Sequence, residues 1–411
     1  MNSLIDDKSL ADQDIQECPW AYYQAMHDKG FYFDEQLGMY MCASYPLMRE
    51  ILRNTQLFSS VNSQNISHMR TPPQEVRDLQ GQMQRTVNIL VSSDPPDHGR
   101  IREMLDAPFR RREIEKLRPK IIEIIGHTID RFVDQGAFEA VEDFAIPIPV
   151  TVIADILGLS RSMAGAIKDW SDASVEPLGM MITDERWIAC TKQIKAFQDF
   201  ISVELEERKT NPRDDLLTHL VQARDEHGNA LTLPEMLGIT SQILVAGNET
   251  TTNGIAAGIQ MLIENPEQQR QLRDDPSRIL TFVNEVLRLE SPVQGLFRVV
   301  MEDTEIEGIK VAKGARIMVR FAAANRDAEK YDHPDDLDVC RKNAGTHVGF
   351  GAGIHHCLGA NLAREEMLQA FTVLLKRLDN LAFKPGGNDF THHPSMVLRG
   401  LGALHVTFTP R

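Results

Sequence analysis

The chain has 411 residues, of which 42% are hydrophobic, so it is long enough and apolar enough to bury a large core. Its 44 basic and 59 acidic residues give a formal net charge of −15, and so acidic a protein repels nucleic acid. The 5 cysteines are scattered and show no CxxC spacing, which argues against a disulfide framework or a zinc ribbon.

Neither a signal peptide nor a membrane span is expected. Residues 1–19 are polar and acidic, and no run of about 18 apolar residues occurs anywhere in the chain. These features favour a reducing, cytoplasmic location. The polar stretch 207–214 holds Pro212 but is too short for a linker, and we expect it to be a loop between helices. We therefore expect residues 1–411 to form a single domain.

Helices dominate the predicted structure. Apolar residues at helical spacing predict a helix over 114–133. Thr232 and Glu235 form a capping box, with Pro234 in the first turn, at the start of a helix expected to reach Glu264. At 1.5 Å per residue that helix would be about 50 Å long, so we expect it to be central and buried. Small residues that would let another group pack closely on it are Ala246, Gly247, Gly254, Ala256, Ala257 and Gly258.

Strand signals are fewer and lie toward the two ends of the chain. Short strands with turns are expected over 31–42 and over 304–319, where Lys313 and Gly314 indicate a turn. Residues 404–409 alternate in the manner of a strand. The predicted fold class is therefore mainly α, with small β-sheets.

The segment 350–359, Phe-Gly-Ala-Gly-Ile-His-His-Cys-Leu-Gly, is the most distinctive in the chain. Cys357 precedes a helical pattern over 360–378, where free N–H groups and the helix dipole favour a thiolate. The glycines permit tight turns and let a flat ligand approach. Such a sulfur suits the axial position of a haem iron.

Two other interpretations of this segment were considered. One is a glycine loop with a buried, inert cysteine, which would be the better interpretation of a lone cysteine. The other is a zinc site formed by His355, His356 and Cys357. Adjacent histidines point in different directions and no second ligand pair lies at a useful spacing, which argues against zinc.

The same segment resembles a known family. Phe350, Gly353, Cys357 and Gly359 match the haem-binding signature of cytochromes P450, and His355 matches a position common in bacterial members. The resemblance extends over nearly the whole chain. It implies haem b (iron protoporphyrin IX) between the long central helix and the helix after the cysteine loop. It also implies that Cys357 is the iron ligand, whose thiolate pushes electron density onto the metal.

The resemblance implies further haem contacts. His98 and Arg102, four residues apart, share a helix face and would serve a haem propionate together with Arg298. Taken alone, the first two would more simply be a solvated charged helix start. The cofactor-binding residues expected in full are His98, Arg102, Ala246, Gly247, Arg298, Phe350, Gly351, His355, Cys357 and Gly359.

Glu285 and Arg288 form an ExxR pair, which the resemblance makes a buried structural pair behind the haem-binding loop. Without the resemblance, such a pair is usually a surface ion pair. The chain departs from the common family pattern at Ala328, Asp336 and Leu337. Arginine is frequent at the position of Asp336, so Arg341 is the candidate for a third partner of the pair.

Glu249 and Thr250 lie together in the middle of the central helix. A threonine hydroxyl inside a helix can bond the carbonyl one turn back. The resemblance makes this the oxygen-activation site, with Thr250 beside dioxygen and Glu249 in proton delivery. The alternative is a helix kink with a solvated glutamate. The next residue, Thr251, would point about 100° away around the helix.

The expected activity is insertion of one oxygen atom of O2 into an organic substrate. A peroxide-driven oxidation or an isomerase or dehydratase reaction is the alternative within the family, and the Glu249–Thr250 pair argues against it. A haem-based sensor or carrier is a further alternative, but no output module is visible in the sequence.

Electrons would come from a separate ferredoxin- or flavodoxin-like protein with its reductase. The basic segment Phe109–Arg112 could attract such an acidic partner, although it could equally be an ordinary solvated helix start. The substrate is expected to be largely apolar, a terpenoid, steroid or aromatic compound. The expected pocket residues are Val87, Leu90, Met180, Met181, Leu244, Val293, Leu296, Met396 and Val397.

Overall fold

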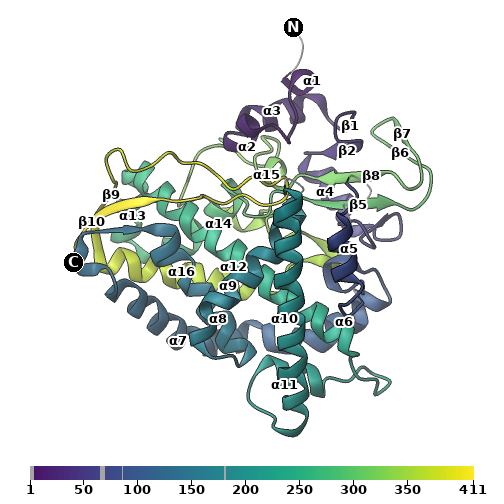
Figure 1. Cartoon of the computed structure of the whole chain (residues 1–411). Coiled ribbons are helices and arrows are strands. Elements are labelled where there is room, and N and C mark those ends of the chain that lie inside the picture. The colour runs from purple at the N-terminus through teal and green to yellow at the C-terminus, as the bar shows by residue number, and fades with distance from the viewer. Residues whose placement is uncertain (1–3, 65–69, 86, 180–181) are drawn as a thin grey trace.

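The computed structural model describes residues 4–64, 70–85, 87–179 and 182–411. Most of these residues lie in helices, as predicted (Figure 1). The α-helices are α1 Leu4–Asp7, α2 Gln13–Glu17, α3 Trp20–Lys29, α4 Tyr45–Arg53, α5 Gln74–Gln80, α6 Asp97–Asp106, α7 Arg111–Asp130, α8 Pro147–Leu157, α9 Ala164–Val175, α10 Asp184–Thr210, α11 Leu216–Gln222, α12 Leu233–Glu264, α13 Pro266–Asp274, α14 Ile279–Leu289, α15 Phe321–Ala324 and α16 Ala360–Arg377. None of the described helices is both long and apolar enough to cross a membrane.

The strands form small sheets beside the helices. One sheet has the order β1-β2-β8-β5-β3, with β2 and β8 parallel and its other pairs antiparallel. A second has the order β4-β10-β9, and β6 pairs with β7. The strands are β1 Tyr32–Asp34, β2 Met39–Cys42, β3 Phe58–Ser59, β4 Ala137–Glu139, β5 Leu296–Val300, β6 Thr304–Ile306, β7 Ile309–Val311, β8 Arg316–Val319, β9 Leu378–Phe383 and β10 His405–Pro410.

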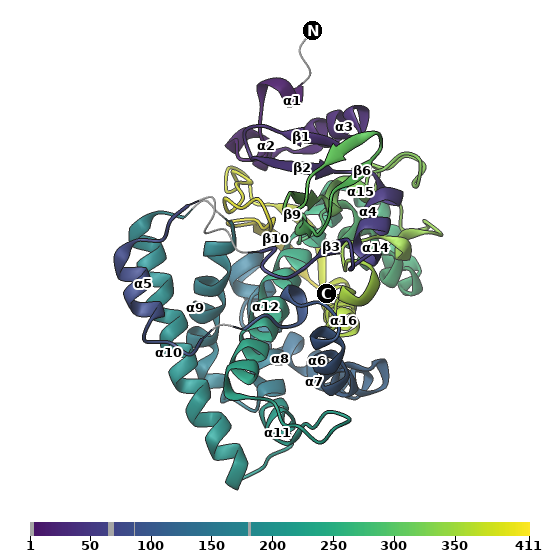
Figure 2. The same ribbon diagram turned by 90° about the vertical axis from the view of Figure 1, so that its right-hand side faces the viewer.

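The long central helix is α12, and it begins where the capping box predicts. The Thr232 side chain accepts a hydrogen bond from the Glu235 N–H, and Glu235 accepts one from the Thr232 N–H at 2.7 Å. Helices α8, α9, α14 and α16 all pack against it, so most of its length is inside the molecule. In Figure 2, α5, α9, α10 and α11 stand together on one side, and the N-terminal elements with β1 and β2 lie at the top.

Glycines on α12 allow α16 to approach it closely. A Cβ atom on Gly258 would lie 2.2 Å from the ring of Phe371, and one on Gly254 would lie 2.9 Å from the terminal methyl of Met367. Both distances are too short for a real side chain, so larger residues at these positions would separate the two helices. The prediction that small residues on this helix permit close packing is therefore confirmed, and α16 is the group that packs there.

Two sequence-based boundaries need comment. The helix predicted over 114–133 is α7, which starts slightly earlier, at Arg111. The loop predicted over 207–214 is wrong in its first half, because α10 continues to Thr210. Arg208 is fully buried there and is bonded to Glu204 and Asp215, each at 2.8 Å. This buried ion pairing holds a polar stretch in helical form.

Glu285 lies on α14 and is paired with two arginines, all three side chains being buried. One carboxylate oxygen accepts from Arg288 Nε at 2.6 Å, and the other accepts from Arg341 Nε at 3.0 Å. The main-chain carbonyl of Asp336 accepts from both guanidinium groups. Arg341 thus occupies the third place in the cluster, and Asp336 contributes through its backbone. The cluster joins α14 to the irregular segment before the cysteine loop.

Candidate functional site

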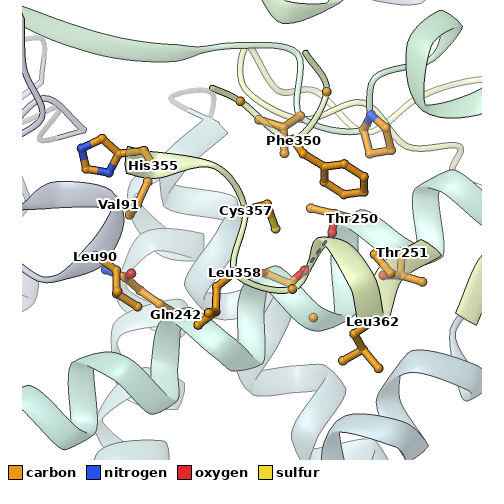
Figure 3. A pocket seen from close by; sticks show the side chains of 18 of the residues that line it. Leu90, Val91, Gln242, Thr250, Thr251, Phe350, His355, Cys357, Leu358 and Leu362 are labelled. Atoms are coloured by element: carbon orange, nitrogen blue, oxygen red, sulfur yellow. Dashed lines mark hydrogen bonds between the residues drawn. The ribbon is translucent and has the colours of Figure 1, made fainter. Parts of the chain in front are cut away.

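A cavity between α12 and the 349–359 loop collects residues from distant parts of the sequence. Its walls come from the turn at Leu90, from α6, from α12, from β5 and the residues before it, from the loop, and from the start of α16. Figure 3 shows Cys357, Thr250 and Gln242 among the side chains around this cavity. The expected haem contacts all line this cavity, namely His98, Arg102, Ala246, Gly247, Arg298, Phe350, Gly351, His355, Cys357 and Gly359.

The cysteine loop is a closed turn whose shape depends on glycine. The Cys357 N–H donates to the Phe350 carbonyl at 2.9 Å, which brings the two ends of the loop together. Gly351 and Gly353 have φ angles of +70° and +69°, a region that disfavours other residues. A Cβ atom on Gly353 would also lie 2.7 Å from the Leu52 carbonyl of α4. The loop is therefore fitted tightly against α4.

Burial governs the protonation of Cys357. Burial raises the pKa of the Cys357 thiol, while the Gly359 N–H and the charges of Arg102 and Arg364 act in the opposite direction. The expected contribution of the helix start to a thiolate is present, but it is smaller than the cost of burying the charge. A metal cation next to the sulfur would reverse this balance, because coordination deprotonates a thiol.

Two arginines give one end of the cavity a positive charge. Arg298 is 1% exposed, and its Nη1 donates to the Phe297 carbonyl at 2.8 Å. Its Nε has no hydrogen-bond partner among the residues that the structure describes, and burial lowers its pKa to about 10. Arg102 is partly exposed and donates to the His356 carbonyl at 2.9 Å. A buried guanidinium with an unused N–H would be stabilised by an anion that accepts a hydrogen bond from it.

His98 and His355 lie at the same end of the cavity. Their rings are 4.5 Å apart at 68°, and His355 Nε2 is 3.0 Å from Ser60 Oγ. Burial lowers the pKa of both histidines, that of His355 to about 3 with Arg298 close by. Both rings are therefore neutral near pH 7 and can take part in hydrogen bonds without adding charge. The two arginines supply the positive charges.

These features together fit haem b. The walls are mainly apolar, as a porphyrin ring requires, and the sulfur of Cys357 provides a soft ligand for iron. Ala246 and Gly247 leave space beside the middle of α12 where a flat ring could lie. The two arginines at one end match the two carboxylates of a haem. The Arg298 Nε, which has no partner among the described residues, could donate a hydrogen bond to one of them.

The hydroxyls of Thr250 and Thr251 have different partners. Thr250 Oγ1 donates to the Ala246 carbonyl at 2.7 Å, as expected for a threonine inside a helix. The Thr251 side chain faces the carboxyl group of Glu366 on α16 and acts to lower the pKa of that group. Both threonines line the cavity, so the offset of about 100° between them does not turn Thr251 away from it. The cavity therefore extends over both of the α12 faces that carry these threonines.

Glu366 is a site residue that the sequence did not reveal. It lies on α16, is 2% exposed and lines the cavity, and burial raises its pKa to about 8. The only signal available was an acidic residue on the apolar side of the predicted 360–378 helix. Gln242 was missed in the same way, because it is a polar residue on the apolar face of α12.

Glu249 does not line the cavity and instead faces α9. Its carboxylate is 3.3 Å from the ammonium group of Lys168, which is also paired with Asp172. Burial raises the pKa of Glu249 to about 7; Asp172 raises it further and Lys168 opposes the rise. The acid next to Thr250 in sequence therefore sits on the neighbouring face of α12 with a pKa near neutrality.

The expected substrate residues divide into two groups. Leu90, Val293 and Leu296 line the cavity. Val87, Leu244, Met396 and Val397 pack into or against apolar core clusters and are outside the lining. Met180 and Met181 lie outside the described residues. Apolar residues occur both in the core and on the walls of an apolar pocket, so the sequence alone does not tell a core residue from a pocket residue. Cavity residues that the sequence did not indicate include Val91, Ile153, Gln242, Pro292, Phe321 and Glu366.

Comparisons with known proteins identify the family. The model of the family described as "Cytochrome P450" matches residues 180–400. Cytochrome P450 107B1 of Saccharopolyspora erythraea is 34% identical over 77% of this chain and 76% of that protein. The vitamin D(3) 25-hydroxylase of Pseudonocardia autotrophica is 35% identical over 79% of this chain and 78% of that protein.

A solved structure shows the same fold. Cytochrome P450 CREJ in complex with (4-ethylphenyl) dihydrogen phosphate superposes with a TM-score of 0.90, covering 96% of this chain and 98% of that one at 26% identity. The mainly helical fold with small sheets is thus that of these enzymes. Together with the glycine loop that carries Cys357, these likenesses show that the chain belongs to the cytochrome P450 family of monooxygenases.

Proposed function

We propose that this chain is a haem-dependent monooxygenase that inserts one atom of O2 into a largely apolar organic substrate and takes its electrons from a separate redox protein. The observation that carries the proposal is the position of Cys357 on the cavity wall with the buried Arg298 at the cavity end. Bound haem supplies the chemistry, in which two electrons and two protons turn the second oxygen atom into water.

The residues that would hold the haem follow from the geometry of the cavity. Cys357 would bind the iron. Arg298 and Arg102 would pair with the two carboxylates, and His98 and His355 would complete the hydrogen bonding there. The remaining contacts would be made along the ring by small or aromatic residues of the two walls, namely Ala246, Gly247, Phe350, Gly351 and Gly359.

Thr250 and two carboxyl groups would manage the protons. The Thr250 hydroxyl donates to Ala246, so its lone pairs remain able to accept from a water in the cavity. Glu249 has a pKa of about 7 and can take up and release a proton near neutral pH. Glu366, with a pKa of about 8, stays mainly protonated at pH 7 and faces Thr251. The α12 segment thus has a proton source on each side.

The apolar lining of the cavity indicates a broad class of substrate. Leu90, Val293 and Leu296 give an apolar wall, which favours a neutral terpenoid, steroid or aromatic compound over a small charged acid. The relative from Pseudonocardia autotrophica is named for vitamin D(3), an apolar substrate, whereas the neighbour of known structure holds an aryl phosphate. Family membership therefore leaves the substrate open, and the lining residues carry this part of the proposal.

The electron donor would dock near the cysteine loop. Arg110, Arg111 and Arg112 are exposed, and the Phe109 carbonyl before them accepts from the Asn361 side chain at 3.2 Å. Asn361 lies at the start of α16, directly after the cysteine loop. The basic segment is thus next to the sulfur side of the cavity. Its charge suits an acidic ferredoxin- or flavodoxin-like protein served by its own reductase.

The thiolate ligand is tested by replacing Cys357 with histidine. The Cys357→His variant should lose the red-shifted Soret band that the reduced CO complex of a haem-thiolate protein shows, because imidazole replaces the thiolate. Cys18→Ser, at an exposed cysteine, should keep the band. Purified protein without haem, or a Cys357→His variant with the band intact, would show that the central assignment is wrong.

Replacing Thr250 with alanine should uncouple electron use from oxidation. Product formed per NADH should fall by about tenfold, with peroxide released, since a positioned proton-transfer group contributes at least that much. The matched control is Thr252→Ala, because Thr252 is bonded to the Ala145 carbonyl and is absent from the described lining of the cavity. If both variants form the same amount of product per NADH, Thr250 has no role in proton delivery.

Glu366 should make stability depend on pH. Its pKa is raised from 4.5 to about 8 in the folded chain, so burial of this group disfavours the native state as the pH rises from about 4.5 through 8. Glu366→Gln removes the titration. The variant should therefore gain stability relative to the natural chain over that interval, measured by denaturant unfolding at several pH values. Parallel curves for the two proteins would contradict a buried, titrating Glu366.

The basic segment is tested by charge reversal. Arg110→Glu with Arg112→Glu should slow reduction by an acidic ferredoxin severalfold at low salt, and the difference should shrink as salt screens the charges. Arg270→Glu serves as the control, since Arg270 is an exposed arginine on α13. If the control slows reduction as much as the double variant, overall charge rather than this segment guides the partner.

A further inference from the structure

The segment before α6 is attached to α12 at two points through one residue, Ile89. Gln242 Nε2 donates to the Ile89 carbonyl at 3.1 Å. The Ile89 side chain packs against Gly238, where a Cβ atom would lie 2.7 Å from Ile89 Cδ1. Gly238 and Gln242 are four residues apart and lie on one face of the helix. Ile89 is therefore held by its side chain and by its main chain.

The two residues after Ile89 form part of the cavity wall. Leu90 and Val91 line the cavity and belong to a short 3-10 turn, Leu90–Ser92. Leu90 has a φ of +41°, a conformation that leucine avoids unless its surroundings impose it. Ser92 Oγ accepts from the Ile89 N–H at 3.2 Å and donates to the Ile89 carbonyl at 3.1 Å. The position of this wall thus depends on how Ile89 is held.

Gln242 differs from the other polar side chains that α12 presents to the described cavity. The Thr250 hydroxyl is bonded within its own helix, and Thr251 faces Glu366 of α16, which packs against α12. Among the three, the Gln242 amide alone is bonded to the segment before α6. This bond joins a rigid helix to a short turn that carries two wall residues.

We propose that Gln242 is a specificity-determining positioning residue: its hydrogen bond to Ile89 fixes Leu90 and Val91 as one wall and so limits the size of the substrate. The inference rests on the proposed function, in which the cavity takes haem and an apolar substrate. Without the bond, the packing of Ile89 against Gly238 is what remains of the two attachments of this segment to α12. The wall then moves outward more easily, and longer ligands fit.

The experiment measures ligand size directly and needs no turnover. A series of 1-alkylimidazoles of increasing chain length binds haem iron through nitrogen and shifts its spectrum, which gives a dissociation constant for each length. Gln242→Leu keeps the side-chain volume but removes the donor. Affinity for the longest members should rise about three- to tenfold, the range expected for one neutral hydrogen bond, and affinity for the shortest should stay the same.

Hydrogen exchange supplies a second readout on the same variants. The amides of residues 89–93 should exchange about three- to tenfold faster in Gln242→Leu, because the turn opens more often. The matched control is Gln269→Leu, which removes a bond of the same kind, from Gln269 Nε2 to the Leu262 carbonyl at 3.0 Å, on α13. That control should change neither the exchange of these amides nor the length profile.

The packing contact gives an independent test with a built-in rescue. Gly238→Ala places a methyl group against Ile89 Cδ1 and should displace the turn, with the same change in length profile as Gln242→Leu. Adding Ile89→Val removes Cδ1 and should restore the natural profile. If haem binds and the imidazoles shift its spectrum, yet Gln242→Leu alters neither profile nor exchange, the inference is wrong. Protein that takes up no haem overturns the proposed function instead, and exchange at 89–93 still tests the turn.

Discussion

Charge buried away from water is the constraint on which the rest of this structure depends. The cavity brings a cysteine sulfur and the guanidinium of Arg298 into the interior of the protein, away from water. Either charge is costly there unless it meets an opposite one. The thiol is therefore neutral in the protein alone, and Arg298 keeps an unused donor. A ligand that carries a cation and two carboxylates relieves both costs at once.

The cost of burying a charge also explains the protonation of the groups around the cavity. His98 and His355 stay neutral because burial opposes a further positive charge beside the arginines. Glu366 keeps its proton because burial raises its pKa to about 8, and Glu249 has a pKa near neutrality because Lys168 only partly offsets its burial. At a distance from the cavity, the buried Glu285 has its charge compensated by two arginines.

The sequence predicted what depends on local pattern. The long helix with its capping box, the glycine loop around Cys357 and the class of fold were all accessible, since each is encoded within a few neighbouring residues. The roles of Glu366 and Gln242 were not, because they arise where α16 and the turn before α6 meet α12. Leu244 and Met396 show the converse, as apolar residues in a plausible segment that pack into the core instead. The extension of α10 to Thr210 depended on the burial of Arg208, which composition does not reveal.

The crowding of polar side chains at one end of the cavity has a consequence for how a haem would be seated. Arg102, Arg298, His98 and His355 would pair with carboxylates, so they would determine which edge of a porphyrin ring is placed at that end. They do not distinguish the two faces of the ring, because turning it over about the axis between its carboxylates leaves that edge in place. That choice would fall to the uncharged vinyl and methyl groups at the opposite edge. Assembly would thus select the edge strictly and the face weakly, giving two seated isomers of one holoprotein.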